Sequence, residues 1–227
     1  MEQPVEASRE RAWREIAAID AALEAGEIDE DGWYRAMAAL VVPAYVFAGN
    51  PRAQSGHSGD KARWELARRL VVDAIERDGT FLDVGCANGL LMESVVAWSA
   101  AKGVALEPYG LDIAPELVEL ARMRLPEWAE RIFLGNALGW EPPRRFTFVR
   151  TGLDYVPARR RRELLARLLD RVVEPGGRLI VGVVNEEWEV RATEQLVTSF
   201  GFDVTGRTER AHRDPRIVYR AFWLDAA

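Results

Sequence analysis

The sequence predicts an α/β fold in which a doubly wound, largely parallel sheet has helices on both faces. Short apolar runs alternate five times with segments of helical periodicity, which is the pattern of successive βα units. Two more strand-like runs, 202–209 and 217–224, then follow each other without a helix between them. Consecutive strands of this kind pair in antiparallel fashion, so we expect an antiparallel strand at the end of the sheet.

The chain before the first strand predicts a small helical cap. A first helix is expected from a cap at Ser8 to Gly26, which can end it. A second helix is expected to begin at Asp29 or Asp31. It is expected to be interrupted at Pro43, because proline removes a helical hydrogen bond.

A long turn-rich segment, G-N-P-R-A-Q-S-G-H-S-G-D at 49–60, separates these helices from the sheet. Loops of this length inside compact domains are often lids or binding loops. We therefore expect an N-terminal helical cap and glycine-rich lid loop over 1–60 and a sheet domain over 61–227. The chain has 227 residues, which is long enough for this arrangement.

The sheet domain can be followed element by element. Its helices have apolar residues at helical spacing, such as Leu117, Val118 and Ala121 after Pro115. The fifth strand-like run is almost wholly apolar, which predicts a central position in the sheet. The expected strands are 80–84, 109–113, 132–134, 146–150 and 178–184, with helices at 60–75, 88–101, 115–125, 158–173 and 193–200.

The first strand leads into F-L-D-V-G-C-A-N-G-L at 81–90, which turns through glycines into a helix. Gly85 and Gly89 allow the backbone to approach a ligand closely. Asp112 ends the second strand, where a carboxylate can accept hydrogen bonds from both hydroxyls of a ribose. Asn136 follows the third strand and could meet an adenine edge. Each feature alone fits a tight turn or a helix cap, but their combined order indicates a nucleotide-like ligand.

These motifs resemble those of the class I S-adenosylmethionine-dependent methyltransferases. The family's acid-x-Gly-x-Gly-x-Gly motif matches D-V-G-C-A-N-G at 83–89, with Ala87 in place of the middle glycine. The text Y-G-L-D-I-A-P-E around Asp112 matches the second motif. The tripeptide G-N-A at 135–137 and the run E-P-G-G-R-L-I at 174–180 match later ones.

The resemblance covers about residues 61–225. It implies a Rossmann-like sheet of seven strands whose last strand is antiparallel, with S-adenosyl-L-methionine as cofactor. The reaction would be an in-line displacement from the sulfonium, in which the enzyme orients the reactants and excludes water. The residues implied at the cofactor are Asp83, Gly85, Cys86, Ala87, Asn88 and Gly89 at its methionine end, Asp112 at the ribose, Ile113, Asn136 and Ala137 at the adenine, and Thr151 and Gly152 beside the methyl group.

Few residues are candidates for a general base on the acceptor side. His57 lies in the 49–60 loop, where an exposed loop histidine is an equally good interpretation. Asp154 and Tyr155 follow the fourth strand, where Tyr155 is better suited to a pocket wall than to a base. Trp188, after the fifth strand, could line an acceptor pocket. The pair His57 and His212 lacks metal-ligand spacing, so no metal is expected.

Composition narrows the function. The net charge of -6 disfavours a broad nucleic-acid surface, and no run of about 20 apolar residues predicts a membrane span. The single cysteine fits a reducing cytoplasm. We therefore expect a cytoplasmic methyltransferase acting on O or N of a small molecule, with the acceptor and the oligomeric state left open.

Alternatives remain. An RNA or protein methyltransferase could use the four arginines at 159–162, although a solvated helix start explains them better. A non-catalytic cofactor-binding protein of the same fold is also compatible with the motifs. A nicotinamide dehydrogenase is disfavoured, because the glycine spacing at 85–89 and the final strand pair do not match its pattern.

Overall fold

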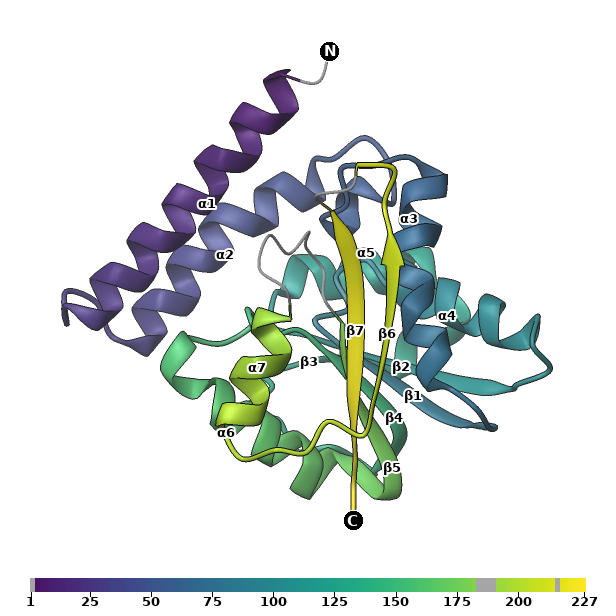
Figure 1. The fold of residues 1–227 in the computed structure, drawn as a ribbon. Helices are drawn as coiled ribbons and strands as arrows, with labels where there is room; N and C mark the ends of the chain where they lie inside the picture. The colour runs from purple at the N-terminus through teal and green to yellow at the C-terminus, as the bar shows by residue number, and fades with distance from the viewer. Residues whose placement is uncertain (1–2, 183–190, 215–216) are drawn as a thin grey trace.

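One seven-stranded sheet forms the centre of the fold (Figure 1). The structure is a computed structural model that describes residues 3–182, 191–214 and 217–227. The strands are β1 Gly79–Val84, β2 Leu106–Asp112, β3 Ile132–Leu134, β4 Phe146–Thr151, β5 Val173–Gly182, β6 Gly206–Ala211 and β7 Val218–Asp225. Their order across the sheet is β3-β2-β1-β4-β5-β7-β6. The first five strands pair in parallel, and β7 runs antiparallel to β5 and β6. The predicted sheet with an antiparallel last strand is confirmed.

Helices cover both faces of this sheet. They are α1 Gln3–Glu24, α2 Glu30–Val46, α3 Lys61–Arg68, α4 Leu90–Ala100, α5 Pro115–Arg124, α6 Arg161–Arg167 and α7 Ala192–Ser199. Phe81 and Phe148 face the layer built by α3, α4 and α5. Leu82 and Val149, their neighbours in the strands, face the layer built by α6 and α7. The predicted double winding is therefore confirmed. Within the described ranges, no helix has the length and hydrophobicity needed to cross a membrane.

The cap helices exist, but their ends differ from the prediction. α1 already includes Ser8, because the residues around it are good helix formers. α2 begins after Asp29, whose Oδ1 accepts a hydrogen bond from the Gly32 N–H at 2.7 Å, as expected. The interruption at Pro43 is wrong. Pro43 lies in the last turn of α2, and although it cannot donate a helical hydrogen bond itself, the helix continues to Val46 and the Phe47 N–H donates to the Pro43 carbonyl at 3.1 Å.

The helix predicted over 60–75 is broken near its middle. α3 is capped by Asp60, as expected, but ends at Arg68, and Arg69–Ala74 form a tighter 3₁₀ turn. The turn is 6 residues long and has buried apolar side chains at Leu70, Val71, Val72 and Ala74, so the chain there is enclosed on several sides. A helix with a single apolar face cannot bury such a run. Arg68, the last residue of α3, is consequently buried.

α2 lies over the carboxyl ends of the strands and brings the cap to the loop after β1. Val42, Tyr45 and Val46 pack against Ala87 in that loop and against residues at the start of α5. α1 packs on α2, and the two helices run side by side outside the sheet (Figure 1). The 49–60 segment then leads from α2 to α3 over the same edge.

The arginine run at 159–162 contacts the start of α2, at the other end of this cap. The Glu30 carboxylate, at the start of α2, pairs with Arg159 at 3.0 Å and Arg160 at 2.8 Å. Arg161 donates to the carbonyl of Leu153, and Arg162 donates to the carbonyl of Phe200. All four arginines thus have intramolecular partners, which weakens the interpretation as an RNA-binding patch.

We expect Glu30→Gln to loosen the start of α2. The change removes two partly exposed ion pairs worth roughly 0.2–1 kcal/mol each, so amide exchange in the first turns of α2 should quicken by about 2–30-fold. Glu27→Gln is the matched control, since this exposed residue precedes the helix. Hydrogen-exchange mass spectrometry measures both, and equal exchange in the two variants would show that these ion pairs do not hold the cap.

Candidate active site

The loop after β1 has a backbone conformation that glycine alone adopts easily. Gly85 has φ +75°, and its N–H donates to the Leu111 carbonyl at 2.7 Å. A Cβ at this position would lie 2.6 Å from the ring of Tyr155. The loop is therefore closed against β2 on one side and covered by an aromatic ring on the other.

Asp112 holds the middle of this loop in place. Ala87 has φ +47°, which is unusual for a residue with a side chain, and its N–H donates to Asp112 Oδ2 at 2.8 Å. Asp112 Oδ1 accepts from the Ala114 N–H at 3.0 Å. Burial raises the pKa of Asp112, and these backbone hydrogen bonds oppose that shift. An ionised carboxylate has about four lone-pair sites, so Asp112 retains acceptor capacity for a ligand.

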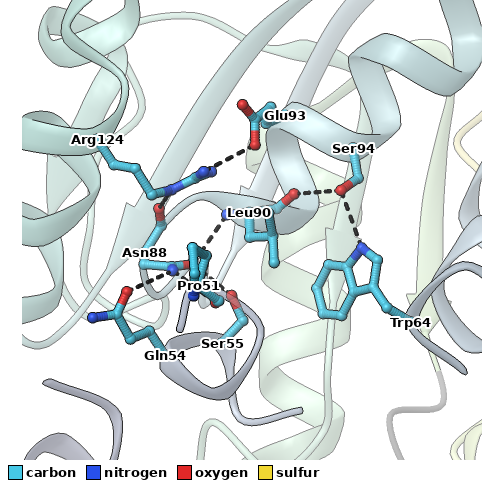
Figure 2. A network of polar contacts seen from close by, with 9 residues as sticks. All are labelled: Pro51, Gln54, Ser55, Trp64, Asn88, Leu90, Glu93, Ser94 and Arg124. Carbon is cyan, nitrogen blue, oxygen red and sulfur yellow. Dashed lines mark hydrogen bonds and ion pairs between the residues drawn. The ribbon is translucent and has the colours of Figure 1, made fainter. Parts of the chain in front are cut away.

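Asn88 joins the same loop to the 49–60 segment (Figure 2). Its side chain is fully buried, with Nδ2 donating to the Pro51 carbonyl at 2.8 Å and Oδ1 accepting from the Ser55 hydroxyl. The Asn88 carbonyl accepts from Arg124 Nε at 2.8 Å, and Arg124 also pairs with Glu93. The sequence did not reveal this role, because the contact joins residues more than 30 positions apart.

A buried ion pair lies where β1 and β4 end. Asp83 and Arg150 are opposite each other in the sheet, and their side chains approach to 3.2 Å with exposures of 1% and 4%. The same guanidinium donates to the Tyr155 hydroxyl at 2.8 Å. Burial raises the pKa of Asp83 to about 6, although Arg150 opposes the shift, so the carboxylate is ionised at pH 7. Its Oδ2 atom is buried without a hydrogen-bond partner in the described structure.

Two further side chains converge on this ion pair. Arg68, at the end of α3, is buried, and its guanidinium lies 5.3 Å from the ring centre of Trp64. Burial and the neighbouring Arg150 lower the pKa of Arg68 to about 10, so it remains charged at neutral pH. Burial and Asp154 raise the pKa of Tyr45, from α2, to about 12. Arg68, Arg150 and Tyr45 were not predicted from the sequence, although a lone arginine in the apolar strand F-T-F-V-R-T was a signal.

Solved structures with the same fold are numerous, although no family model and no curated protein matches the sequence. The N-methyltransferase NodS from Bradyrhizobium japonicum WM9, in complex with S-adenosyl-L-homocysteine, aligns with TM-score 0.60 and 15% identity over 82% of this chain and 96% of NodS. The [4+2]-cyclase SpnF aligns with TM-score 0.57 and 14% identity over 83% and 93%. The ribosomal protein L11 methylase from Lactobacillus delbrueckii subsp. bulgaricus gives 0.50 and 18% over 73% and 79%.

The chain has the class I methyltransferase fold. In this fold the sequence-predicted residues at the adenine end lie at the ends of β2 and β3. Ile113 is 44% exposed after β2. Asn136 forms a turn in which its Oδ1 accepts from the Leu138 N–H at 2.9 Å, and Ala137 packs against the core.

The predicted residues after β4 lie together on the methyltransferase fold's loop edge. Thr151 is buried and donates its hydroxyl to the Gly152 carbonyl at 3.0 Å. A Cβ at Gly152 would lie 2.6 Å from Asp154 Oδ1 and 3.0 Å from the Tyr155 ring. Asp154 itself is exposed at the rim.

Cys86 points away from this edge. Its thiol is buried against Gly110 in β2, where a Cβ would come within 2.8 Å of the sulfur. Burial raises the pKa of the Cys86 thiol well above its ordinary value. Gly89, with φ +75°, packs against Leu125 and ends the loop. Cys86 thus contributes backbone, rather than its side chain, to the loop.

His57 lies in the 49–60 segment, where its neighbours differ from those of the other two base candidates. Its ring is buried and contacts Trp64 edge-on, with centroids 5.3 Å apart. Burial and the charges of Arg68, Arg63 and Arg52 lower the pKa of His57 to about 4, so it is neutral at pH 7. Among the described contacts, none joins it to Asp154 or Tyr155. Its Nε2 atom is buried and has no hydrogen-bond partner among the described residues.

His212 and Trp188 complete the set of candidates that the sequence suggested. His212 Nδ1 accepts from the Asp214 N–H at 3.1 Å, so the side chain stabilises a turn between β6 and β7. Trp188 lies outside the described residues. Within the described part of the chain, no group of three or more His, Cys, Asp or Glu residues could hold a metal ion.

We expect His57 to make the stability of the protein fall with acidity. Its folded-state pKa of about 4 lies below the unfolded value of 6.5, so protons bind the unfolded chain first as the pH drops below 6.5. Between pH 7.5 and pH 5 the wild type should lose about 2 kcal/mol of unfolding free energy relative to His57→Gln.

Urea unfolding at several pH values measures this difference. His212→Gln is the control, because His212 is less buried than His57 and should change the pH dependence less. A constant gap between the wild type and His57→Gln across the pH range would contradict the buried, neutral state of His57.

Proposed function

We propose that this protein is an S-adenosylmethionine-dependent methyltransferase that acts on O or N of a small-molecule acceptor. The observation that carries the proposal is the loop at 85–89 held against the Asp112 carboxylate at the carboxyl edge of the sheet. In open α/β sheets, ligands bind at this edge. Along it, Asn136, Asp112, Gly85 and Thr151 follow the strand order β3, β2, β1, β4.

The residues at this edge fit the chemical groups of S-adenosylmethionine. The Asp83 Oδ2 atom is a buried acceptor without a partner among the described residues, which suits an ammonium group. The free lone pairs of Asp112 suit ribose hydroxyls. The absence of a Cβ at Gly85 lets the Tyr155 ring lie directly on the loop, where it forms a wall of the proposed pocket. When bound, the cofactor supplies an electrophilic methyl group on a sulfonium.

The residues of this chain are better arranged for positioning than for proton transfer. Burial raises the pKa of Tyr155 far above neutrality, and His57 has a pKa near 4, so neither is matched to base catalysis at pH 7. Asp154 is exposed at the rim. These properties support an acceptor that arrives with a free electron pair, such as a neutral amine or a carboxylate.

The cap supports a small acceptor over a macromolecular one. α2 and the 49–60 segment lie over the same edge, contributing Tyr45 and His57, so we propose that residues 1–60 act as part of the active site. Arg159–Arg162, the residues on which an RNA-directed activity would depend, have intramolecular partners. A cytoplasmic location is part of the same proposal.

Asp112→Ala should weaken binding of S-adenosylmethionine and S-adenosylhomocysteine by roughly 10–100-fold, because hydrogen bonds to a charged group contribute about 1.5–3 kcal/mol. Asp112→Asn should lose less, since one carbonyl oxygen remains to accept from the loop. Asp170→Ala, an exposed acid outside the site, is the matched control. Isothermal titration calorimetry gives the affinities. Wild-type protein that binds neither ligand would contradict the proposed function.

A further inference from the structure

The loop after β1 is strained at Ala87. The φ angle of this residue is +47°, in the left-handed region that glycine adopts easily and that residues with a Cβ adopt rarely. The methyltransferase motif that the loop resembles has glycine at this position. A side-chain-bearing residue keeps such a conformation only where the surrounding structure holds it. The loop in this chain therefore needs support from its neighbours.

Part of that support comes from the sheet. The Ala87 N–H donates to Asp112 Oδ2 at 2.8 Å, and the Gly85 N–H donates to the Leu111 carbonyl at 2.7 Å. Both acceptors belong to β2, so these bonds fix the side of the loop that faces the sheet. The side of the loop at Asn88 is held by other elements.

The buried side chain of Asn88 connects the loop to the segment before α3 (Figure 2). Its Nδ2 atom donates to the Pro51 carbonyl at 2.8 Å and, more weakly, to Gln54 Oε1 at 3.5 Å. Its Oδ1 atom accepts from the Ser55 hydroxyl and from the Leu90 N–H at 3.1 Å. Three of the four partners precede α3, and the fourth begins α4. The amide thus uses its donors and acceptor to join three parts of the chain.

The cap also contacts the strained residue itself. The Ala87 side chain packs against Val42, Tyr45 and Val46 of α2. The cap therefore supports the loop at two successive residues, by apolar contact at Ala87 and by hydrogen bonds at Asn88. A glycine at the first of these positions would depend less on this support, because it adopts a positive φ without strain.

We propose that Asn88 is a positioning residue for the cofactor, because it braces the strained Ala87 against residues 51–55 and so couples cofactor binding to the order of those residues. The inference rests on the proposed function, in which the loop at 85–89 receives the cofactor. A ligand that binds the braced loop more tightly than a relaxed one also favours the arrangement in which residues 51–55 are in place. His57 lies just beyond them, so cofactor binding also orders this part of the cap.

The affinity for S-adenosylhomocysteine tests the brace. Ser55→Ala removes one neutral hydrogen bond to Asn88 and should weaken binding roughly 2–10-fold. Asn88→Ala removes all four contacts of the amide and should weaken binding roughly 10–100-fold. Ser58→Ala, an exposed serine of the same segment, is the matched control. Isothermal titration calorimetry gives the affinities, and an unchanged affinity in Asn88→Ala would overturn the proposal.

A second substitution distinguishes a brace from direct contact with the ligand. Glycine adopts the left-handed conformation without strain, so Ala87→Gly should recover roughly 5–30-fold of the affinity that Asn88→Ala loses. In the wild-type background Ala87→Gly should not tighten binding, because the brace already holds the loop. If Ala87→Gly does not rescue Asn88→Ala, the side chain of Asn88 does not act through the position of the loop, and its positioning role is overturned.

Hydrogen-exchange mass spectrometry tests the coupling. In the wild type, saturating S-adenosylhomocysteine should slow amide exchange at 85–90 and at 50–57 together. In Asn88→Ala the slowing should persist at 85–90 and disappear at 50–57. The coupling is overturned if the wild type shows no slowing at 50–57, or if both proteins show the same slowing there.

Failure of the proposed function would be recognised separately, as wild-type protein that binds neither S-adenosylmethionine nor S-adenosylhomocysteine. The brace is then tested in the free protein. Ser55→Ala should quicken exchange at 85–90 relative to Ser58→Ala, and equal exchange in the two variants overturns the brace. Ser55→Ala keeps the buried amide and its remaining partners, so the test still decides if Asn88→Ala does not fold.

Discussion

The ion pair between Asp83 and Arg150 is the interaction on which the candidate site depends. Both groups end strands in the middle of an apolar parallel sheet, where an unpaired charge would be very costly. Because the pair is made, a carboxylate stays ionised beside the glycine loop at a depth that water hardly reaches. The same arginine fixes the Tyr155 hydroxyl, which sets the ring over Gly85. The buried ion pair, the position of the Tyr155 ring and the conformation of the glycine loop therefore depend on one another.

The N-terminal segment belongs to this arrangement and is not an appendage. The buried Asn88 amide is shared between the glycine loop and the turn at 51–55, so a movement of the lid segment would break hydrogen bonds of the loop itself (Figure 2). At the opposite end, Glu30 ties α2 to the connection after β4. The cap is therefore anchored at both sides of the edge.

The sequence was sufficient for features that depend on local pattern and insufficient for those that depend on pairing across the chain. Alternating apolar runs predicted the sheet, its order of βα units and the final antiparallel strand, because each element needs one buried face. The loop at 85–89 and Asp112 could be located because they follow strand ends. Asp83 and Arg150, 67 residues apart, become partners only through the register of β1 and β4. At Pro43 the local pattern led to a wrong prediction, because the energetic cost of a proline depends on its position within the helix.

The electrostatics of the edge also constrain the chemistry. Arg68, Arg63 and Arg52 help to keep His57 unprotonated, since their charges oppose a further positive charge there. The positive potential around His57 therefore disfavours an imidazolium at that position. An acceptor carboxylate or neutral amine would then need orientation more than deprotonation, and buried, hydrogen-bonded side chains such as those of Arg150 and Tyr155 are suited to provide it.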